Sequence, residues 1–283
     1  MAKYYYLISG LPDINLEDDK LLLSTFEFKQ EVYPKLSSKD KKLIDLFYYQ
    51  FDNRNLIGFL NESTAFEFDK RGFFSKDDFQ EFIQAFKNEE PLNSHRFPKY
   101  MEDFLISYLR DELPKGILPY DYLSSLYYNY AMDTSNQFIS SWYEYNLLLN
   151  NLLVVLIGKK HKVDYTRLIV GNSPLVDELR KSYSATFGLD EYDSLDIASL
   201  EKLLDDHNFM EREKKLDAMR WNWLEEHSFF HYFSIERLFV YLNQASMIER
   251  WQGLNSELGD RKIRDIISSL KSEVKVPVEF RKQ

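Results

Sequence analysis

Two segments of this chain share one unusual pattern, a polar amide inside a strongly apolar helical stretch. Residues 51–60 read FDNRNLIGFL and residues 147–160 read LLLNNLLVVLIGKK. In each, an Asn (Asn55, Asn151) is followed by Leu, two variable residues, an apolar residue and a second Leu. An amide is unfavourable in an apolar interior unless it is hydrogen-bonded. Because the exception occurs twice, the sequence predicts a duplicated helical unit in which both amides are buried and bonded to neighbouring helices.

The composition limits the classes of protein that this chain can be. Of its 283 residues, 44% are hydrophobic and 16% are aromatic, so it can bury a substantial core filled largely by rings. The net charge of -10 argues against binding to nucleic acid or to an anionic membrane surface. Cysteine is absent, which excludes disulfides, thiolate metal sites and cysteine nucleophiles. This composition fits a cytoplasmic protein.

Neither a signal peptide nor a membrane span is expected. The opening MAKYYYLISGLP has one Lys and only a short apolar run. The most apolar segment, Leu147–Gly158, is interrupted by Asn150 and Asn151 and is too short to cross about 30 Å of hydrocarbon. We therefore expect a protein without a direct membrane span, which can still lie peripheral to the inner membrane as part of a complex.

Helical periodicity dominates the chain, and alternating strand patterns are scarce. Ser37 and Ser75 each precede an acid three residues later, which is typical of a helix start. The longest predicted helix spans about Ser135–Lys160. No linker divides the chain, so we predict a single all-α body of about three pseudo-repeated helical units. The predicted units are 1–92, 93–190 and 191–283; further helices are predicted from Pro98 and Pro119 and over about 173–182, 196–206, 209–226, 234–251 and 255–272, followed by an extended arm at 272–283.

The candidate metal sites are weak. His227 and His231 have the four-residue spacing of helical ligands, but Ser228 stands where a zincin motif has Glu, so two boundary histidines are the simpler interpretation. The segment that contains Glu67, Asp69 and Gly72 is faintly similar to a calcium loop. An Arg occupies a ligand position just before the Gly, which argues against calcium.

Catalytic and nucleotide-binding patterns are also weak. The Gly-containing turns at 9–10 and 171–173 have neither a glycine-rich fingerprint nor a Lys-Ser/Thr pair. The paired acids at 18–19, 77–78 and 205–206 are adjacent in sequence and point to different sides of a helix, as in a solvated face. We therefore expect no catalytic residue, no cofactor and no metal ligand.

Aromatic and Arg residues near the C-terminal end suggest a surface for a partner protein. Three of the four Trp residues lie between 221 and 251, with Arg residues close by in sequence. Core packing is the simpler interpretation of such rings, but Trp, Tyr and Arg also dominate interface hot spots. Any member that is exposed is a candidate anchor. The candidate interface consists of Trp221, Trp223, Arg237, Tyr241, Arg250 and Trp251.

The repeated motif also carries a resemblance to a known family. The segment Asp52-x-x-Asn55-Leu56 resembles the recurring D-x-x-N-L signature of the C subunit of V/A-type ATPases, called d in eukaryotes. The second copy, with Asn151-Leu152, continues as HKVDYTRLIVGNSPLVDELRKS and resembles the progression of that family, although Leu148 stands at the position of Asp52. The segment IERLFVYLNQASMIERWQGLNSELGDRKIRDIISSL resembles its closing pattern.

The whole chain more closely resembles an uncharacterised bacterial family associated with V-type ATPase operons, a divergent counterpart of that ATPase component. The segments YYYLISGLPDI and RWNWLEEHSFFHYFSIERLFVYL carry this closer match. The resemblance implies a funnel-like, three-fold pseudo-symmetric helical protein in the central stalk, between the rotor shaft subunits and the membrane ring of proteolipid subunits. Such a protein transmits torque and performs no bond chemistry. Two alternatives stay open: a soluble helical scaffold or adaptor that binds another protein through an aromatic groove, and an unrecognised hydrolase or metalloenzyme.

Overall fold

All regular structure in the described part of the chain is helical, which confirms the predicted all-α class. The structure, a computed structural model, describes residues 4–61, 66–90, 96–181, 197–206 and 208–255. The helix and arm expected beyond residue 255 lie outside these ranges. The α-helices are α1 (Tyr5–Ser9), α2 (Thr25–Glu31), α3 (Ser38–Leu60), α4 (Lys76–Lys87), α5 (Lys99–Leu109), α6 (Pro119–Met132), α7 (Gln137–His161), α8 (Pro174–Lys181), α9 (Ile197–Asp205), α10 (Phe209–Ser228) and α11 (Ile235–Asn255), with short 3-10 turns at Tyr33–Lys35 and Thr166–Leu168.

Side-chain caps fix where several helices begin. The Ser75 hydroxyl accepts the Asp78 N–H at 3.3 Å, and the Asp78 carboxylate accepts the Ser75 N–H at 2.6 Å, so α4 starts with a complete capping box. Ser37 accepts the Asp40 N–H at the start of α3. Both caps were predicted from the sequence. Helix α2 opens with the same box, from Ser24 and Glu27, which the sequence reasoning had missed.

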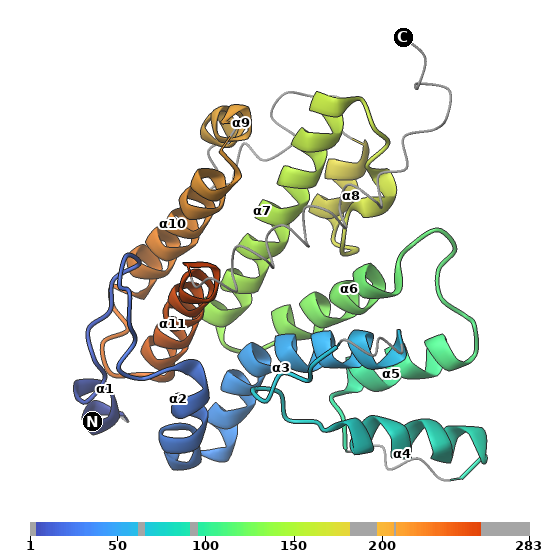
Figure 1. The fold of residues 1–283 in the computed structure, drawn as a ribbon, viewed down its shortest axis with the longest axis horizontal. Helices are drawn as coiled ribbons and strands as arrows, with labels where there is room; N and C mark the ends of the chain where they lie inside the picture. Colours follow the sequence, from blue (N-terminus) through green and yellow to red (C-terminus); the bar gives the residue numbers. More distant parts are fainter. Residues whose placement is uncertain (1–3, 62–65, 91–95, 182–196, 207, 256–283) are drawn as a thin grey trace.

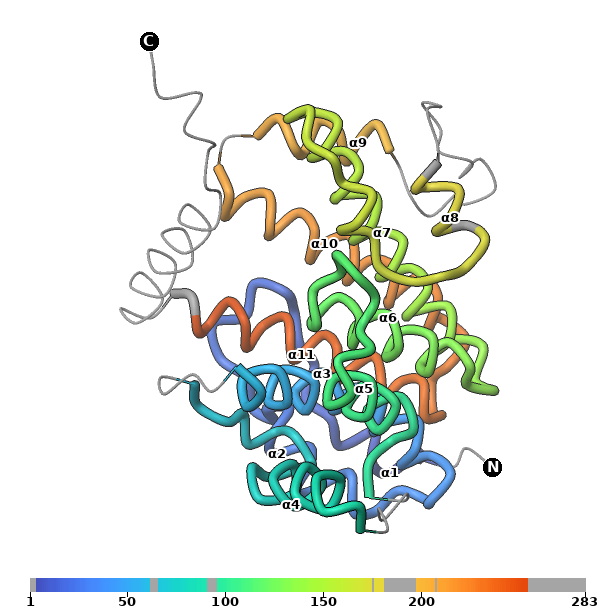
Figure 2. Tube along the Cα trace, turned by 90° about the vertical axis from the view of Figure 1, so that its right-hand side faces the viewer, coloured from blue at the N-terminus to red at the C-terminus, as the bar shows by residue number. Residues whose placement is uncertain are grey.

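Helix α11 is the centre of the molecule. It packs against α2, α3, α7 and α10, and Figures 1 and 2 show it between the upright α7–α10 pair and the layer formed by α3. Its core positions face all of these neighbours. A helix that is apolar around most of its circumference is stable only when other elements enclose it in this way. The fully buried positions include Leu238, Phe239, Val240, Leu242, Ala245 and Ile248.

Both amides of the repeated motif are buried and hydrogen-bonded, as predicted. Asn55 is fully buried, and its Nδ2 donates to the Asp69 carbonyl at 2.9 Å while its Oδ1 accepts the Asp69 N–H at 2.8 Å. Asn151 is 1% exposed and bonds Val170 in the same way, at 2.7 and 2.9 Å. The partners are not neighbouring helices, as had been expected, but loop backbone. In each case one side-chain amide pairs with both the N–H and the C=O group of a single loop residue. We call each arrangement an Asn clamp.

The loops held by the two clamps share a second contact. The Phe66 ring lies against Gly58 of α3, and the Tyr165 ring lies against Gly158 of α7, in each case so closely that a Cβ on the Gly would be 2.4 Å from a ring carbon. Glycine is therefore needed at both positions for the loop to approach its helix. These shared contacts concern α3, α7 and their loops. The division into units 1–92, 93–190 and 191–283, and a funnel shape, remain predictions.

None of the described helices combines the length and the apolar character that crossing a membrane requires.

Candidate functional site

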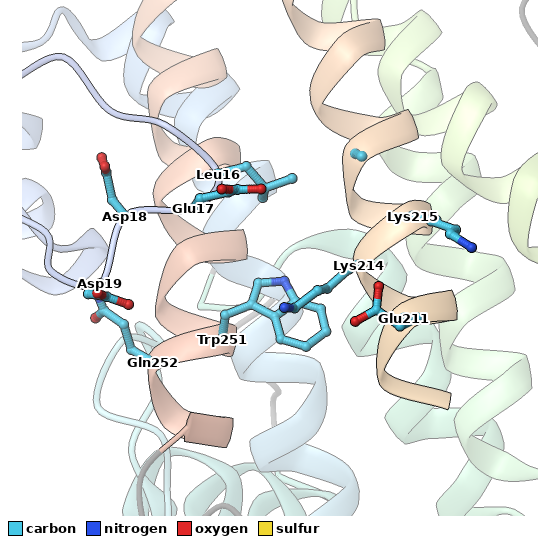
Figure 3. A pocket seen from close by; sticks show the side chains of 10 residues that line it. Leu16, Glu17, Asp18, Asp19, Glu211, Lys214, Lys215, Trp251 and Gln252 are labelled. Carbon is cyan, nitrogen blue, oxygen red and sulfur yellow. The ribbon is translucent and has the colours of Figure 1, made fainter. Parts of the chain in front are cut away.

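An open cleft of about 730 Å³ lies beside the C-terminal half of α11. Figure 3 shows its three sides: a loop that contains residues 16–19, the first turns of α10, and Trp251 with Gln252 on α11 between them. We call this the Trp251 cleft. Its lining residues are Leu16, Glu17, Asp18, Asp19, Glu211, Lys214, Lys215, Ala218, Trp251 and Gln252.

The floor of the Trp251 cleft is held rigid by a buried carboxylate. Asp217 of α10 is 2% exposed, and its Oδ2 accepts the Trp251 indole N–H at 2.9 Å. The same side chain pairs with Arg220 at 3.2 Å and with Arg250. A buried carboxylate is tolerable only with such partners. These bonds join α10 to α11 and fix the orientation of the Trp251 ring, which is 7% exposed and lines the cleft.

The walls of the cleft carry more negative than positive charge. Four carboxylates and two lysines line it, and one of the lysines, Lys215, is already paired with Asp206 at 3.0 Å. Lys214 lies 5.9 Å from the centroid of the Trp251 ring, a cation–π contact. The acidic excess therefore lies on the loop wall, where Glu17 is exposed. Such a cleft suits a segment with one apolar face and a row of cations.

The structure separates the six residues of the candidate interface. Trp223 and Tyr241 are core residues: Trp223 stacks on His227 at 4.0 Å between ring centroids, and the Tyr241 hydroxyl donates to the Leu23 carbonyl at 2.8 Å. Trp221 and Arg237 are half-buried. Arg250 is exposed beside the cleft and Trp251 lies at its floor. Helical spacing cannot turn every member of so dense a set outward, so core packing takes the central rings.

A group of exposed aromatics, not singled out by the sequence reasoning, lies where α1 meets the turn between α10 and α11. Tyr6 is 90% and Phe230 is 85% exposed. The Tyr5 ring contacts Phe233 at 4.9 Å between centroids, and the Tyr4 N–H donates to the Phe233 carbonyl at 3.3 Å, which ties α1 to the turn. The sequence contains a signal for this group, the aromatic-rich run 229–233 between two predicted helices, because the side chains of a connecting turn lie on the surface. We call Tyr5, Tyr6, Phe229, Phe230, Tyr232 and Phe233 the aromatic tip.

A buried carboxylate, Asp52, lies beside the first Asn clamp and has no counterpart at the second. The Asp52 Oδ1 accepts the N–H groups of Phe73 and Phe74 at 2.7 and 3.0 Å, whereas its Oδ2 is buried without a hydrogen-bond partner. Burial raises the pKa of Asp52 to about 7. Gly72 must be glycine here, because a Cβ would lie 2.5 Å from the Asp52 Oδ1. The carboxylate thus helps Asn55 to hold the loop, a role that Leu148 cannot have in the second copy.

The weak metal and calcium patterns lead to local contacts. The His227 ring bonds the Trp223 carbonyl at 2.9 Å, and His231 lies 3.8 Å from Glu236. Asp69 pairs with the Arg71 guanidinium at 2.6 Å, so the loop supplies its own cation. Within the described residues, no group of three or more His, Cys, Asp or Glu side chains is placed to hold a metal ion.

Comparison with known proteins gives one result. A family model described as protein of unknown function (DUF2764) matches residues 1–274, which is nearly the whole chain. No curated protein and no solved structure matches. The match therefore identifies the family of the chain without indicating an activity.

Proposed function

We propose that this chain, which belongs to the DUF2764 family, is a non-catalytic central-stalk subunit of a V/A-type ATPase that couples the rotor shaft to the membrane proteolipid ring. The resemblance of Asp52-x-x-Asn55-Leu56 and of the second Asn-Leu copy to a known stalk component of these ATPases supports the proposal. The shared backbone pairing of Asn55 and Asn151 supports it further, because a pseudo-symmetric protein should use equivalent contacts in equivalent units.

The Trp251 cleft is the observation that carries the proposal. Its fixed aromatic floor and its acidic loop wall fit a basic, amphipathic helix, and we assign this role to a helix of a rotor shaft subunit. The floor is preorganised by the bond from Trp251 to Asp217, so little side-chain entropy is lost when the helix docks. Attraction between opposite charges would steer the encounter and fix the orientation of the helix.

A coupling protein needs a second contact, and the aromatic tip supplies a surface for it. Tyr and Phe side chains with large exposed fractions are suited to the boundary between water and membrane, where the ends of the proteolipid helices lie. We assign the aromatic tip to the proteolipid ring. The two surfaces lie on different elements, since the cleft is formed by the 16–19 loop with Glu211–Ala218 and Trp251, and the tip by α1 with the α10–α11 turn.

Co-purification from detergent extracts tests the proposal with one variant for each surface. Glu17→Lys with Asp19→Lys should abolish recovery of the shaft subunits and leave the proteolipid ring bound; Phe230→Ser should do the reverse. Glu112→Lys and Leu118→Ser, at exposed positions away from both surfaces, are the matched controls and should behave like wild type. Surface changes of this kind alter stability by less than about 0.5 kcal/mol, which circular dichroism and urea unfolding can verify.

Two outcomes would contradict the proposal. If the wild-type chain recovers neither shaft nor ring proteins, it is not a stalk subunit, and the scaffold or adaptor hypothesis takes its place. If wild type recovers both and the cleft variant still binds the shaft, the Trp251 cleft is not the contact.

A further inference from the structure

A second cavity, of about 210 Å³, lies between α3, α6, α7 and α11. Its walls are mainly aromatic rings and amides, and the Tyr127 ring lies 5.6 Å from that of Tyr143 and 5.7 Å from that of Tyr128. These rings are held by their own contacts, since the Tyr127 hydroxyl donates to the Leu46 carbonyl at 2.7 Å. Wall residues of the cavity are therefore held in place by contacts within the protein. We call it the tyrosine cavity; it is lined by Gln50, Asn53, Arg54, Tyr120, Ser124, Tyr127, Tyr128, Trp142, Tyr143, Asn146 and Asn243.

One amide of the tyrosine cavity, Asn53, uses only its oxygen in hydrogen bonds within the described chain. Asn53 is 7% exposed, and its Oδ1 accepts the Tyr100 hydroxyl at 2.7 Å. Its Nδ2 has no hydrogen-bond partner among the described residues and is open to solvent, so it can donate to water or to a ligand. The other three wall amides are bonded within the protein: Gln50 donates to the Phe47 carbonyl at 2.8 Å, Asn146 donates to the Trp142 carbonyl at 2.8 Å, and Asn243 accepts the Trp142 indole N–H at 3.1 Å. Asn53 therefore presents an unused donor to the cavity.

The charge at the tyrosine cavity is positive. Arg54 is its one charged lining residue within the described chain; it forms no ion pair or hydrogen bond with the other described residues, although its charge helps to lower the pKa of Asp69. Behind the wall, Arg220 donates to the Asn146 side-chain oxygen at 3.2 Å. A cation and an unused amide donor that line the same cavity are suited to bind a carboxylate.

We propose that the tyrosine cavity binds a small planar carboxylate. The ring of the ligand would lie among the Tyr and Trp rings, and its carboxylate would accept hydrogen bonds from the Asn53 amide and the Arg54 guanidinium. The size agrees with this class, since a cavity of about 150 Å³ accommodates benzene and the tyrosine cavity has about 210 Å³. This inference does not depend on the proposed role in a rotary ATPase.

Calorimetric titration of the purified full-length chain with benzoate tests the proposal. Benzoate should bind with a dissociation constant of about 1 mM or lower, the range open to a ligand of this size. Benzamide, which has the same shape without the charge, and cyclohexanecarboxylate, which has the charge without the planar ring, should each bind about tenfold more weakly. Arg54→Gln should weaken benzoate binding by about tenfold, the effect of one charge-assisted hydrogen bond.

Two further variants sharpen the result. Arg110→Gln changes an exposed Arg on a different face and should bind benzoate like wild type. Ser124→Leu fills part of the cavity and should abolish binding; the exposed Arg54 variant keeps the test valid if Ser124→Leu does not fold. The proposal is overturned if benzoate fails to bind at about 10 mM, or if it binds Arg54→Gln as tightly as it binds wild type.

Discussion

Replacing Asn151 by Leu tests whether the Asn clamps hold the loops to the long helices. The substitution keeps the side-chain size but removes both bonds to Val170, at 2.7 and 2.9 Å. Each buried backbone group left unpaired costs about 1–3 kcal/mol. Val170 is half-buried, so water satisfies part of this loss and the two groups together cost about 2–4 kcal/mol. The larger apolar surface of Leu offsets about 1 kcal/mol.

The expected net loss is therefore about 1–3 kcal/mol of unfolding free energy. Urea unfolding followed by circular dichroism and tryptophan fluorescence measures it as a lower midpoint with an unchanged slope. Asn222→Leu, at an exposed position of α10, is the matched control and should lie within about 0.5 kcal/mol of wild type. Asn55→Leu should resemble Asn151→Leu, because it loses the same pair of bonds. The argument is refuted if Asn151→Leu unfolds at the same urea concentration as Asn222→Leu.

The remaining predictions concern pH, backbone strain and the cleft floor. Burial raises the folded-state pKa of Asp52 to about 7 and that of Asp45 to about 6. The folded state therefore binds these protons more tightly than the unfolded state does, and the free energy of unfolding is highest below the unfolded pKa near 4 and falls as pH rises to about 7. Between pH 5 and 8, the unfolding free energy of Asp52→Asn should rise by about 2 kcal/mol relative to that of wild type, because only wild type must ionise a buried carboxyl. Urea unfolding measures this, and a difference between the two proteins that does not change with pH would contradict it. Gly171 has a φ of +96°, so Gly171→Ala should lower stability by at least about 1 kcal/mol, measurable by thermal unfolding. Asp217→Asn should lower stability by about 2–4 kcal/mol, because Arg220, whose side chain is 16% exposed, loses the charge of its buried partner. Urea unfolding measures this loss, and a change in the quenching of Trp fluorescence relative to wild type should report the loosened cleft floor.

The sequence predicted the long helices well because their signals are local. Caps such as Ser75 with Asp78, and apolar periodicity over five or more turns, lie within the helix that they define. The short helix α2 was missed although Ser24 and Glu27 form its box, because seven residues carry too little periodicity to distinguish it from a loop. The burial of Asn55 and Asn151 was predictable for the same local reason, whereas their loop partners, 14 and 19 residues away, were not.

The candidate surfaces could not be predicted in the same way, because they depend on which distant segments meet. The loop with Glu17 faces α10, about two hundred residues later in the chain, across Trp251 of α11. Trp223 and Trp251 have similar sequence surroundings, yet one is enclosed by rings of α7 and the other lines the cleft. Helical spacing shows that two residues share a face but not what covers that face.

The two Asn clamps share the amide pairing but differ in the residue three positions before the Asn, which is Asp52 in the first copy and Leu148 in the second. In the first copy, Asp52 adds a carboxylate that holds the N–H groups of Phe73 and Phe74, and this side chain titrates near neutral pH. In the second, Leu148 is buried and apolar, so the loop is held without a titratable group in that position. The amide pairing is common to both copies and the charge is not. Holding a loop to its helix is therefore the shared role of the two Asn clamps, whereas any pH dependence through Asp52 should be confined to the first clamp, on α3.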